Sequence, residues 1–189
     1  MTAARTPQRV SYEDFLKMEN ESDRKHEWVD GVVYAMTRGT PDHGELTARM
    51  IGLLLQAKGC RTFASDTAIF IEAANMHTYA DASLVCGSLQ KRAVRDRNEK
   101  SIGEAITNPC VIVEVLSAST DRYDRDGKFE AYKKLPSFEQ YVLVSQDEPH
   151  IEVRTREGGQ WTACIYGPGE SVRVHGVQAA IDAIYESIV

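Results

Sequence analysis

The residues whose types and spacing could support chemistry are two acids in apolar surroundings, Asp81 and Glu114, and a later lysine, Lys128. Glu114 interrupts the apolar run 111–116, and Asp81 lies within the run 78–86. Both runs are short, and β-branched residues dominate the first, so we expect two strands. Burying a carboxylate is costly unless it meets a cation or hydrogen-bond donors. The pattern therefore indicates either a functional site or a structural ion pair with Arg or Lys.

A divalent cation is the functional alternative for Asp81 and Glu114. If their strands are neighbours, two bare carboxylates repel, so either one stays protonated or a cation binds between them. Oxygen ligands favour Mg²⁺ or Mn²⁺, and the backbone carbonyl of Val115 could add a ligand. Such a metal polarises a phosphate and lowers the pKa of a bound water. Lys128 could then orient that water or stabilise charge on the phosphate, although by itself it is more simply a solvated residue paired with Asp124.

Six short stretches carry a further signal, because together they resemble a known family. They are 27–31, 42–43, 65–66, 79–81, 113–120 and 123–129. In this order they are similar to the Uma-two family, bacterial proteins with a restriction-endonuclease-like fold of the PD-(D/E)XK superfamily. The resemblance covers residues 10–155 and implies a metal-dependent, nuclease-like site.

By this resemblance, Asp81 matches the motif aspartate and Glu114 matches the motif acid. The position two residues after that acid is Leu116, where the superfamily pattern has lysine. The resemblance implies that the lysine has moved to the following helix, which fits Lys128. Ala80 stands where a proline is usual, a change that does not touch the chemistry.

Three further residues match positions of the family without a clear role. Glu27 and Asp66 are either additional metal ligands or partners of the ligands, or they serve the hairpin and turn in which they lie. His43 is either a family-like site residue or an ordinary cap at a helix start.

The remaining pattern predicts an α/β (α+β) fold: a restriction-endonuclease-like mixed central sheet flanked by helices, with added β-hairpins. We expect one domain over residues 1–189, with a loose arm at 1–10. The expected helices cover 11–18, a segment from Asp42 or His43 to 59, a segment capped within Ser119–Asp121 and ending at 135, and 177–188. The expected strands are 26–29, 32–36, 61–64, 68–71, 78–86, 111–116, 138–145, 150–156, 160–166 and 172–174, with a turn at 72–77.

Residues 87–108 are predicted to form a long polar loop or short helix, and they are the most basic local segment. Its cations are Lys91, Arg92, Arg95, Arg97 and Lys100. A solvated surface segment and a contact to phosphate are both open. Aromatic residues are absent from the segment, so base stacking from it is not expected.

Composition excludes several classes of protein. The net charge of −6 argues against strong nonspecific attraction to nucleic acid. No apolar stretch is long enough for a membrane span, and no secretory signal is present, so we expect a cytoplasmic protein without a membrane partner. The four cysteines, at 60, 86, 110 and 164, include no CxxC pair. They are interpreted as buried thiols in a reducing compartment, neither a zinc site nor a disulfide framework.

The sequence therefore favours a divalent-metal-dependent endonuclease or phosphodiesterase acting on nucleic acid, most simply DNA. Its cofactor is expected to be Mg²⁺ or Mn²⁺, held by Asp81, Glu114 and Val115, with Lys128 assisting. The alternative is a non-catalytic accessory protein on the same fold that binds nucleic acid or protein. Apolar stripes on the last hairpin and the last helix predict a homodimer.

Overall fold

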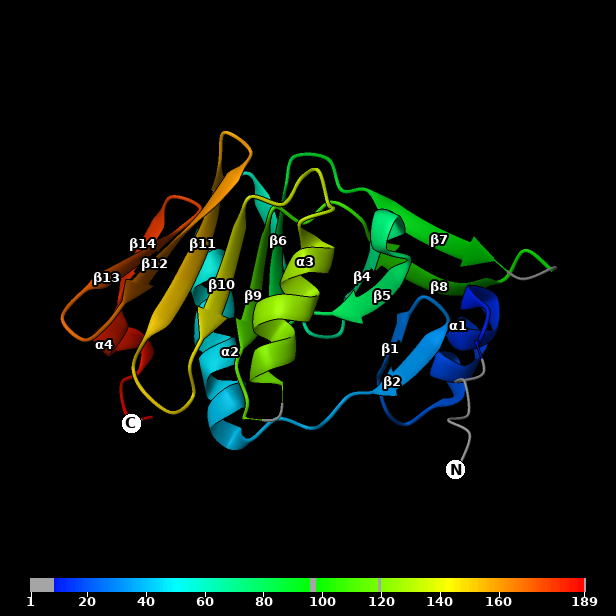
Figure 1. Cartoon of the computed structure of the whole chain (residues 1–189), viewed down its shortest axis with the longest axis horizontal. Helices are drawn as coiled ribbons and strands as arrows, with labels where there is room; N and C mark the ends of the chain where they lie inside the picture. Colours follow the sequence, from blue (N-terminus) through cyan, green and yellow to red (C-terminus); the bar gives the residue numbers. More distant parts are fainter. Residues whose placement is uncertain (1–8, 96–97, 119, 189) are drawn as a thin grey trace, which may run out of the picture.

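The computed structural model describes residues 9–95, 98–118 and 120–188 and shows a mixed α+β fold (Figure 1). Two six-stranded mixed sheets and one two-stranded sheet are joined by few helices, which confirms the predicted fold class. Of the expected arm at 1–10, only Arg9 and Val10 are described. Both contact the turn that follows β1: the Arg9 side chain bonds Asp30, and the Val10 N–H donates to the Gly31 carbonyl. Arg97 and Ser119 lie outside the described residues.

The first sheet contains a parallel strand–helix–strand connection between β9 and β10. Its strand order is β12-β11-β10-β9-β6-β3. The bounds are β3 Cys60–Ala64, β6 Ala82–Cys86, β9 Val111–Val115, β10 Gln140–Val144, β11 Ile151–Glu157 and β12 Gln160–Tyr166. β9 and β10 are parallel, whereas the other neighbours are antiparallel. The strand that carries Glu114 therefore lies in the interior of the sheet.

The second sheet has the order β2-β1-β5-β4-β8-β7. Its bounds are β1 His26–Val29, β2 Val32–Ala35, β4 Ala68–Ile71, β5 Met76–Tyr79, β7 Lys91–Arg95 and β8 Ser101–Ile106. The predicted hairpin at Asp30-Gly31 is confirmed, and both turn residues have positive φ, as a two-residue hairpin turn of this kind requires. The third sheet pairs β13, Ser171–Val174, with β14, Val177–Ala180.

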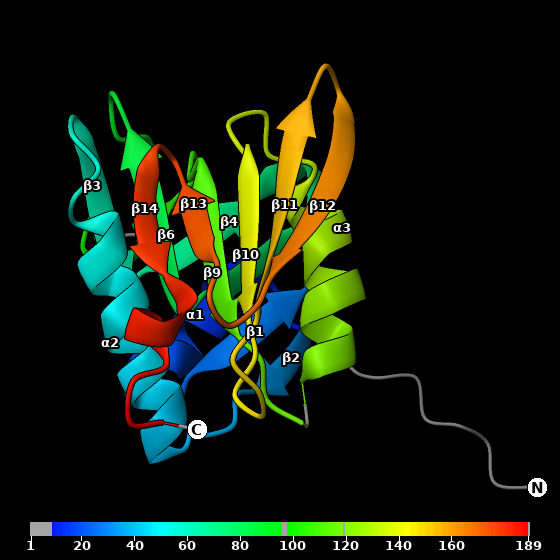
Figure 2. The same ribbon diagram turned by 90° about the vertical axis from the view of Figure 1, so that its left-hand side faces the viewer.

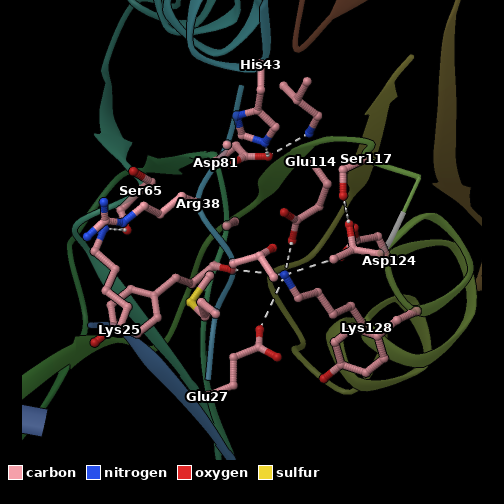
Figure 3. Close-up of a pocket in the computed structure, with 18 of the residues that line it drawn as sticks. Lys25, Glu27, Arg38, His43, Ser65, Asp81, Glu114, Ser117, Asp124 and Lys128 are labelled. Carbon is pink, nitrogen blue, oxygen red and sulfur yellow. Dashed lines mark hydrogen bonds and ion pairs between the residues drawn. The ribbon is translucent and has the colours of Figure 1, made fainter. Parts of the chain in front are cut away.

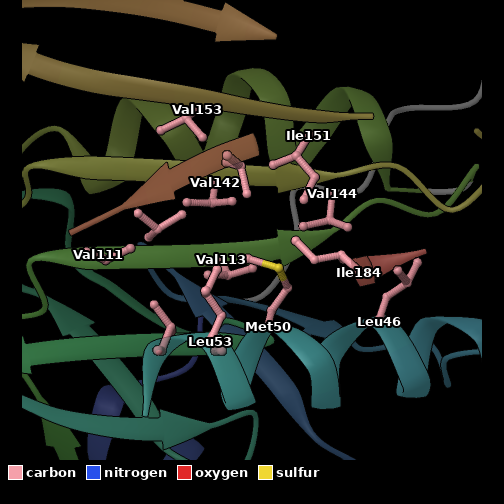
Figure 4. Close-up of a cluster of buried hydrophobic side chains, with 14 of the residues drawn as sticks. Leu46, Met50, Leu53, Val111, Val113, Val142, Val144, Ile151, Val153 and Ile184 are labelled. Atoms are coloured by element: carbon pink, nitrogen blue, oxygen red, sulfur yellow. The ribbon is translucent and has the colours of Figure 1, made fainter. Parts of the chain in front are cut away.

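Alternate residues of β9 enter two different cores. Val111, Val113 and Val115 pack with α2, Pro41–Leu54, together with Val142 and Val144 of β10 (Figure 4). The side chains of α2 that reach this core are Leu46, Met50, Leu53 and Leu54. The short helix α4, Ile181–Ile184, also packs in this core.

The opposite face of β9 meets a second helical segment. Ile112 packs there with residues of α3, Phe129–Tyr132, which continues directly from the π-helical segment η2, Tyr123–Lys128. Residues of β4 and β5 share this core, so the second sheet also borders it. Figure 2 shows α2 and α3 on opposite sides of the first sheet. Helix α1, Tyr12–Glu21, covers the other face of the second sheet. Glu114 follows the parity of Ile112, so its side chain points toward η2 and α3.

Several predicted elements differ in the structure. The strand expected over 78–86 is interrupted: β5 ends at Tyr79 in the second sheet, and β6 begins at Ala82 in the first. Asp81 therefore lies in the gap between two strands and not inside one, which fits the rarity of Asp in strand interiors. The turn expected at 72–77 is only partly right, because η1, Glu72–Ala74, is followed by β5.

The basic segment 87–108 is not a loop, because its described residues contain the antiparallel pair β7 and β8. Ile102, Ala105 and Ile106 of β8 are buried. The cations serve local contacts: Lys91 pairs with Glu104, and Arg92 lies over the ring of Phe70. These contacts favour the surface interpretation of the segment over a phosphate contact.

The terminal helix expected at 177–188 is right only in its middle third. Residues 177–180 form β14, and only Ile181–Ile184 is helical. The apolar residues Ile181, Ile184 and Tyr185 are buried against α2 in the chain's own core. They are not available as a dimer surface, so the predicted homodimer keeps only β12 as its basis, an edge strand whose Ile165 is 66% exposed.

The interpretation of the cysteines as four buried thiols is also wrong. Cys60 and Cys86 are directly opposite each other in β3 and β6 and form a disulfide. Cys110 is a buried free thiol, whereas Cys164 is exposed on β12. The spacing along the chain did not show this pairing, because the two partners are brought together by strand register.

Among the described residues, no helix is long and apolar enough to cross a membrane.

Leu54 and Leu55 offer a test of the α2 core with adjacent residues of one type. Leu54 is 1% exposed and Leu55 is 68% exposed. We expect Leu54→Ala to lower the free energy of unfolding by about 2–5 kcal/mol, because it leaves a cavity between α2 and the first sheet. Leu55→Ala should change it by no more than about 0.5 kcal/mol. Denaturant unfolding of the two variants checks this, and equal losses would contradict the packing.

Candidate active site

A cleft of about 840 Å³ opens at the end of the first sheet where β9 finishes and β6 begins (Figure 3). The loop from β2 to α2, residues 36–40, forms one wall, and η2 forms another. All three site residues predicted from the sequence, Asp81, Glu114 and Lys128, line this cleft, as does Val115. β6, which begins just after Asp81, and β9, which carries Glu114, are neighbours in the first sheet.

The buried ammonium of Lys128 is the centre of the site. Its Nζ lies 3.2 Å from Oε1 of Glu114, 3.3 Å from Oε1 of Glu27 and 3.3 Å from Oδ1 of Asp124. It also donates to the carbonyl oxygen of Tyr79 at 3.2 Å. Lys128 is 5% exposed, so these contacts occur away from water. Lys128 is therefore buried, and the simpler interpretation, which predicted a solvated lysine, is wrong on this point.

Helical spacing explains part of this cluster. Asp124, Lys128 and Tyr132 follow one another at intervals of four and share a face, as predicted. That face meets β9, where the hydroxyl of Tyr132 donates to Oε1 of Glu114 at 3.0 Å. Glu27 comes from β1 in the other sheet and accepts a hydrogen bond from the hydroxyl of Thr78. One lysine thus connects both large sheets and the helical segment between them.

Burial and charge act against each other in this cluster. Burial raises the pKa of Glu114 well above its ordinary 4.5, while the Lys128 ammonium acts to lower it. Burial also raises the pKa of Asp124, again opposed by Lys128. For Lys128, burial lowers the pKa, but attraction to Glu114, Glu27 and Asp124 outweighs this effect and holds it well above 10.5. Lys128 therefore stays charged, and it favours the ionised form of the acids around it.

Asp81 is held at the opposite wall of the cleft by α2 and β9. Its Oδ2 accepts the backbone N–H of Val115 at 2.7 Å and lies 3.3 Å from Nε2 of His43. The hydrogen bond to Asp81 raises the pKa of His43 against the effect of burial, with a smaller contribution from a hydrogen bond to the backbone of Val115. Thr40 caps α2 by accepting the N–H of His43, which positions the imidazole. The helix thus starts earlier than Asp42, and His43 is not its cap.

The register of β6 and β9 brings the backbone of Asp81 beside the strand that carries Glu114. Ala82 pairs with Val113 and Ser83 with Ile112. Continuing this antiparallel register by one residue puts Asp81 opposite Glu114. Within the described residues, the hydrogen bonds and ion pairs of these carboxylates use Oδ2 of Asp81 and Oε1 of Glu114. Their other oxygens are hard donors that fit Mg²⁺ or Mn²⁺.

The resemblance to a family pointed to Glu27 and His43 without fixing their roles, and the structure puts both in the cleft. Asp66 is different, because its side chain is 89% exposed and pairs with Lys25 outside the acid cluster. The contact of Tyr132 with Glu114 depends on the packing of α3 against β9, which the spacing along the chain does not show.

The fold and the acidic cleft together define a class of proteins. The structure superposes with a TM-score of 0.72 on the crystal structure of "a putative nuclease belonging to DUF820" from Anabaena variabilis ATCC 29413. The match covers 95% of this chain and 99% of that chain at 16% sequence identity, so it shows the shared fold.

Sequence comparison then identifies the family. Residues 12–182 match the Uma2 family, described as "Putative restriction endonuclease". The uncharacterised protein slr1290 of Synechocystis sp. (strain ATCC 27184 / PCC 6803 / Kazusa) is 32% identical over 186 residues, covering 95% of this chain and 93% of that protein. A second uncharacterised protein of the same organism, sll1609, is 25% identical over 165 residues, covering 85% of this chain and 89% of that protein. The chain therefore belongs to the Uma2 family, and the resemblance seen in the sequence is confirmed.

Replacing Lys128 tests its role in holding the acids. We expect Lys128→Met to lower the free energy of unfolding by about 3–5 kcal/mol near neutral pH, because it leaves buried carboxylates without a cation. Since the folded pKa of Glu114 and Asp124 is raised, the fold favours their neutral forms, and the loss should shrink as pH falls toward 4.5. Denaturant unfolding at several pH values measures this.

Lys25→Met provides the matched control for that change. Lys25 pairs with Asp66, whose side chain is 89% exposed, so its loss should cost no more than about 1 kcal/mol. The double variant Lys128→Met/Glu114→Gln should recover part of the loss, because it removes one of the stranded charges. A Lys128→Met loss that does not vary between pH 5 and pH 8 would contradict the electrostatic account.

Proposed function

We propose that this protein is a Mg²⁺- or Mn²⁺-dependent endonuclease that hydrolyses phosphodiester bonds of nucleic acid, most simply DNA. The observation that carries the proposal is that Asp81 and Glu114 line the same cleft, which also contains a buried lysine. Membership of a family described as "Putative restriction endonuclease" supports the same reaction class.

Each residue of the cleft has a part in this proposal. Asp81 and Glu114 supply the carboxylate oxygens that would hold the metal, and the carbonyl of Val115 is the candidate third ligand. When bound, the metal would polarise the phosphate and lower the pKa of a water molecule. The backbone N–H of Val115 and the imidazole of His43 hold the Asp81 carboxylate in place. Lys128 opposes the rise that burial causes in the pKa of Glu114, and so favours the ionised form, which is the form that binds a metal.

Lys128 has a constraint that the sequence did not reveal. An ammonium group has three N–H donors, whereas four oxygens lie within 3.3 Å of Nζ, from Glu114, Glu27, Asp124 and the Tyr79 carbonyl. Its donors are therefore already committed in this arrangement. To contact a water or a phosphate, Lys128 must exchange one of these oxygens. Its effect in the resting arrangement is electrostatic positioning of the acids.

The mouth of the cleft offers cations for a polyanion. Lys25 and Arg38 line the cleft, and Arg38 is exposed on the loop between β2 and α2. Figure 3 shows both on the side of the cleft away from η2. Phosphate contacts from such residues position a nucleic acid without reading its sequence. They provide local attraction despite the net charge of −6.

The exchange of one carboxylate for its amide tests the proposed metal ligands. We expect Asp81→Asn and Glu114→Gln each to lower Mg²⁺-dependent cleavage of plasmid DNA by about a hundredfold or more, because each removes a charged ligand of the metal. Asp66→Asn makes the same chemical change at an exposed acid outside the cleft and should leave cleavage unchanged. Circular dichroism should show that all three variants are folded.

A non-catalytic accessory protein remains the competing proposal, favoured by the four oxygens that already engage Lys128. Isothermal calorimetry with Mg²⁺ and with DNA separates the two. Metal binding that Asp81→Asn abolishes, together with cleavage, supports the nuclease. DNA binding without cleavage in any divalent metal supports the accessory role. The predicted homodimer is tested separately by the mass in solution, since a monomer would remove β12 as an interface.

A further inference from the structure

A second cluster of potential ligands lies at the other end of β6. Cys60 of β3 and Cys86 of β6 are joined by a disulfide, and His175 faces both sulfurs. Nε2 of His175 is 3.2 Å from Sγ of Cys86 and 3.6 Å from Sγ of Cys60. The three donor atoms all lie within 4.8 Å of one another. Among the described residues, this is the one group of three or more histidine, cysteine or acidic side chains whose donor atoms all lie this close together.

A third sulfur adjoins this group. Sγ of Cys110, the buried free thiol just before β9, lies 3.4 Å from Sγ of Cys86. The four side chains come from four places in the chain: β3, β6, the segment before β9, and the turn between β13 and β14. A disulfide that served only to join β3 and β6 would need neither a histidine nor a third cysteine beside it. The cluster therefore contains more ligands than a crosslink requires.

The backbone holds His175 toward the sulfurs. His175 and Gly176 form the turn of the β13–β14 hairpin, and His175 has φ 45, a left-handed conformation uncommon outside glycine. Its backbone N–H donates to Oε1 of Gln140 at 2.7 Å, which ties the turn to the end of β10. A two-residue hairpin turn of this kind requires positive φ at both positions, so the turn and the Gln140 contact together fix the place of His175 beside the sulfurs.

The donor set and its spacing match zinc. Three thiolates and one imidazole form one of the usual structural Zn²⁺ sites, with Zn–S near 2.3 Å and Zn–N near 2.0–2.1 Å. A tetrahedron of these bond lengths puts its donor atoms about 3.5–3.8 Å apart. The distances from Cys86 to His175 and Cys110, and from Cys60 to His175, are 3.2, 3.4 and 3.6 Å. These three distances are close to those of a tetrahedral zinc site. Cys110 does not lie within 4.8 Å of all three other donors, so its sulfur must move closer once the disulfide opens.

We propose that the reduced protein binds one Zn²⁺ through Cys60, Cys86, Cys110 and His175, and that the disulfide is the metal-free, oxidised form of the same site. A dithiol reductant transfers two electrons to the disulfide, which opens to two thiols, and the dithiol becomes a cyclic disulfide. The three thiols then lose their protons as their sulfurs bind Zn²⁺. Cys60, Cys86 and His175 are all partly exposed, so a reductant and the metal can reach them.

The test uses the full chain, reduced with a dithiol that is then removed by gel filtration without oxygen. We expect the reduced chain to bind one equivalent of Zn²⁺ by calorimetry, and Co²⁺ to give the ultraviolet absorption of thiolate ligands. The chain with its disulfide intact should bind neither ion with this signature. Cys110→Ser and His175→Asn should each weaken Zn²⁺ binding at least tenfold, since each removes a ligand.

Two controls separate this site from other sources of binding. Cys164→Ser removes an exposed cysteine outside the cluster and should leave the Zn²⁺ affinity unchanged. Asp81→Asn disables the acidic cleft and should also leave it unchanged. Loss of Zn²⁺ binding in Asp81→Asn, no thiolate absorption with Co²⁺, or only two titratable thiols after reduction of the folded protein would each overturn the proposal.

Discussion

The interaction on which the rest of this structure depends is the burial of one ammonium, that of Lys128, among three carboxylates. Two charges taken out of water cost several kcal/mol each unless their partners compensate well. Here the partners come from β1, β9 and η2, so the compensation exists only when both large sheets and the helical segment are in place. Removing any one of these elements leaves a buried charge without a partner. The cluster therefore forms only when the whole fold forms.

The same cluster explains why acids can persist beside an apolar core. Glu114 lies next to Ile112 and faces the second core, where hydrophobic burial alone would favour its neutral form. Lys128 and Tyr132 supply a charge and a hydrogen bond to one of its oxygens. The carboxylate therefore stays available to a cation in the cleft through its other oxygen. The Asp81 carboxylate is held instead by a backbone N–H and an imidazole.

Sequence reasoning predicted local pattern well and distant partners poorly. Glu114 and Lys128 were identified because a charge in an apolar strand and a four-residue helical spacing are local signals. The strands β7 and β8 of the second sheet were not predicted, because the apolar residues of β8 are separated by polar ones within a basic segment. Glu27 gained its role from a contact with Lys128 about a hundred residues away in the chain, and the disulfide arose from the register of β3 and β6. Neither contact leaves a periodic trace in the sequence.

β6 and β9 give the molecule two chemically different ends. At one end Asp81 and Glu114 present oxygen donors, and at the other Cys86 and Cys110 present sulfur. Hard cations prefer the first set and soft cations the second, so the ends need not compete for the same metal. Cys86 lies five positions after Asp81, a span of about 17 Å along a strand. Because both ends belong to the same strand pair, the register that places Asp81 opposite Glu114 also sets the spacing of the Cys86 and Cys110 sulfurs.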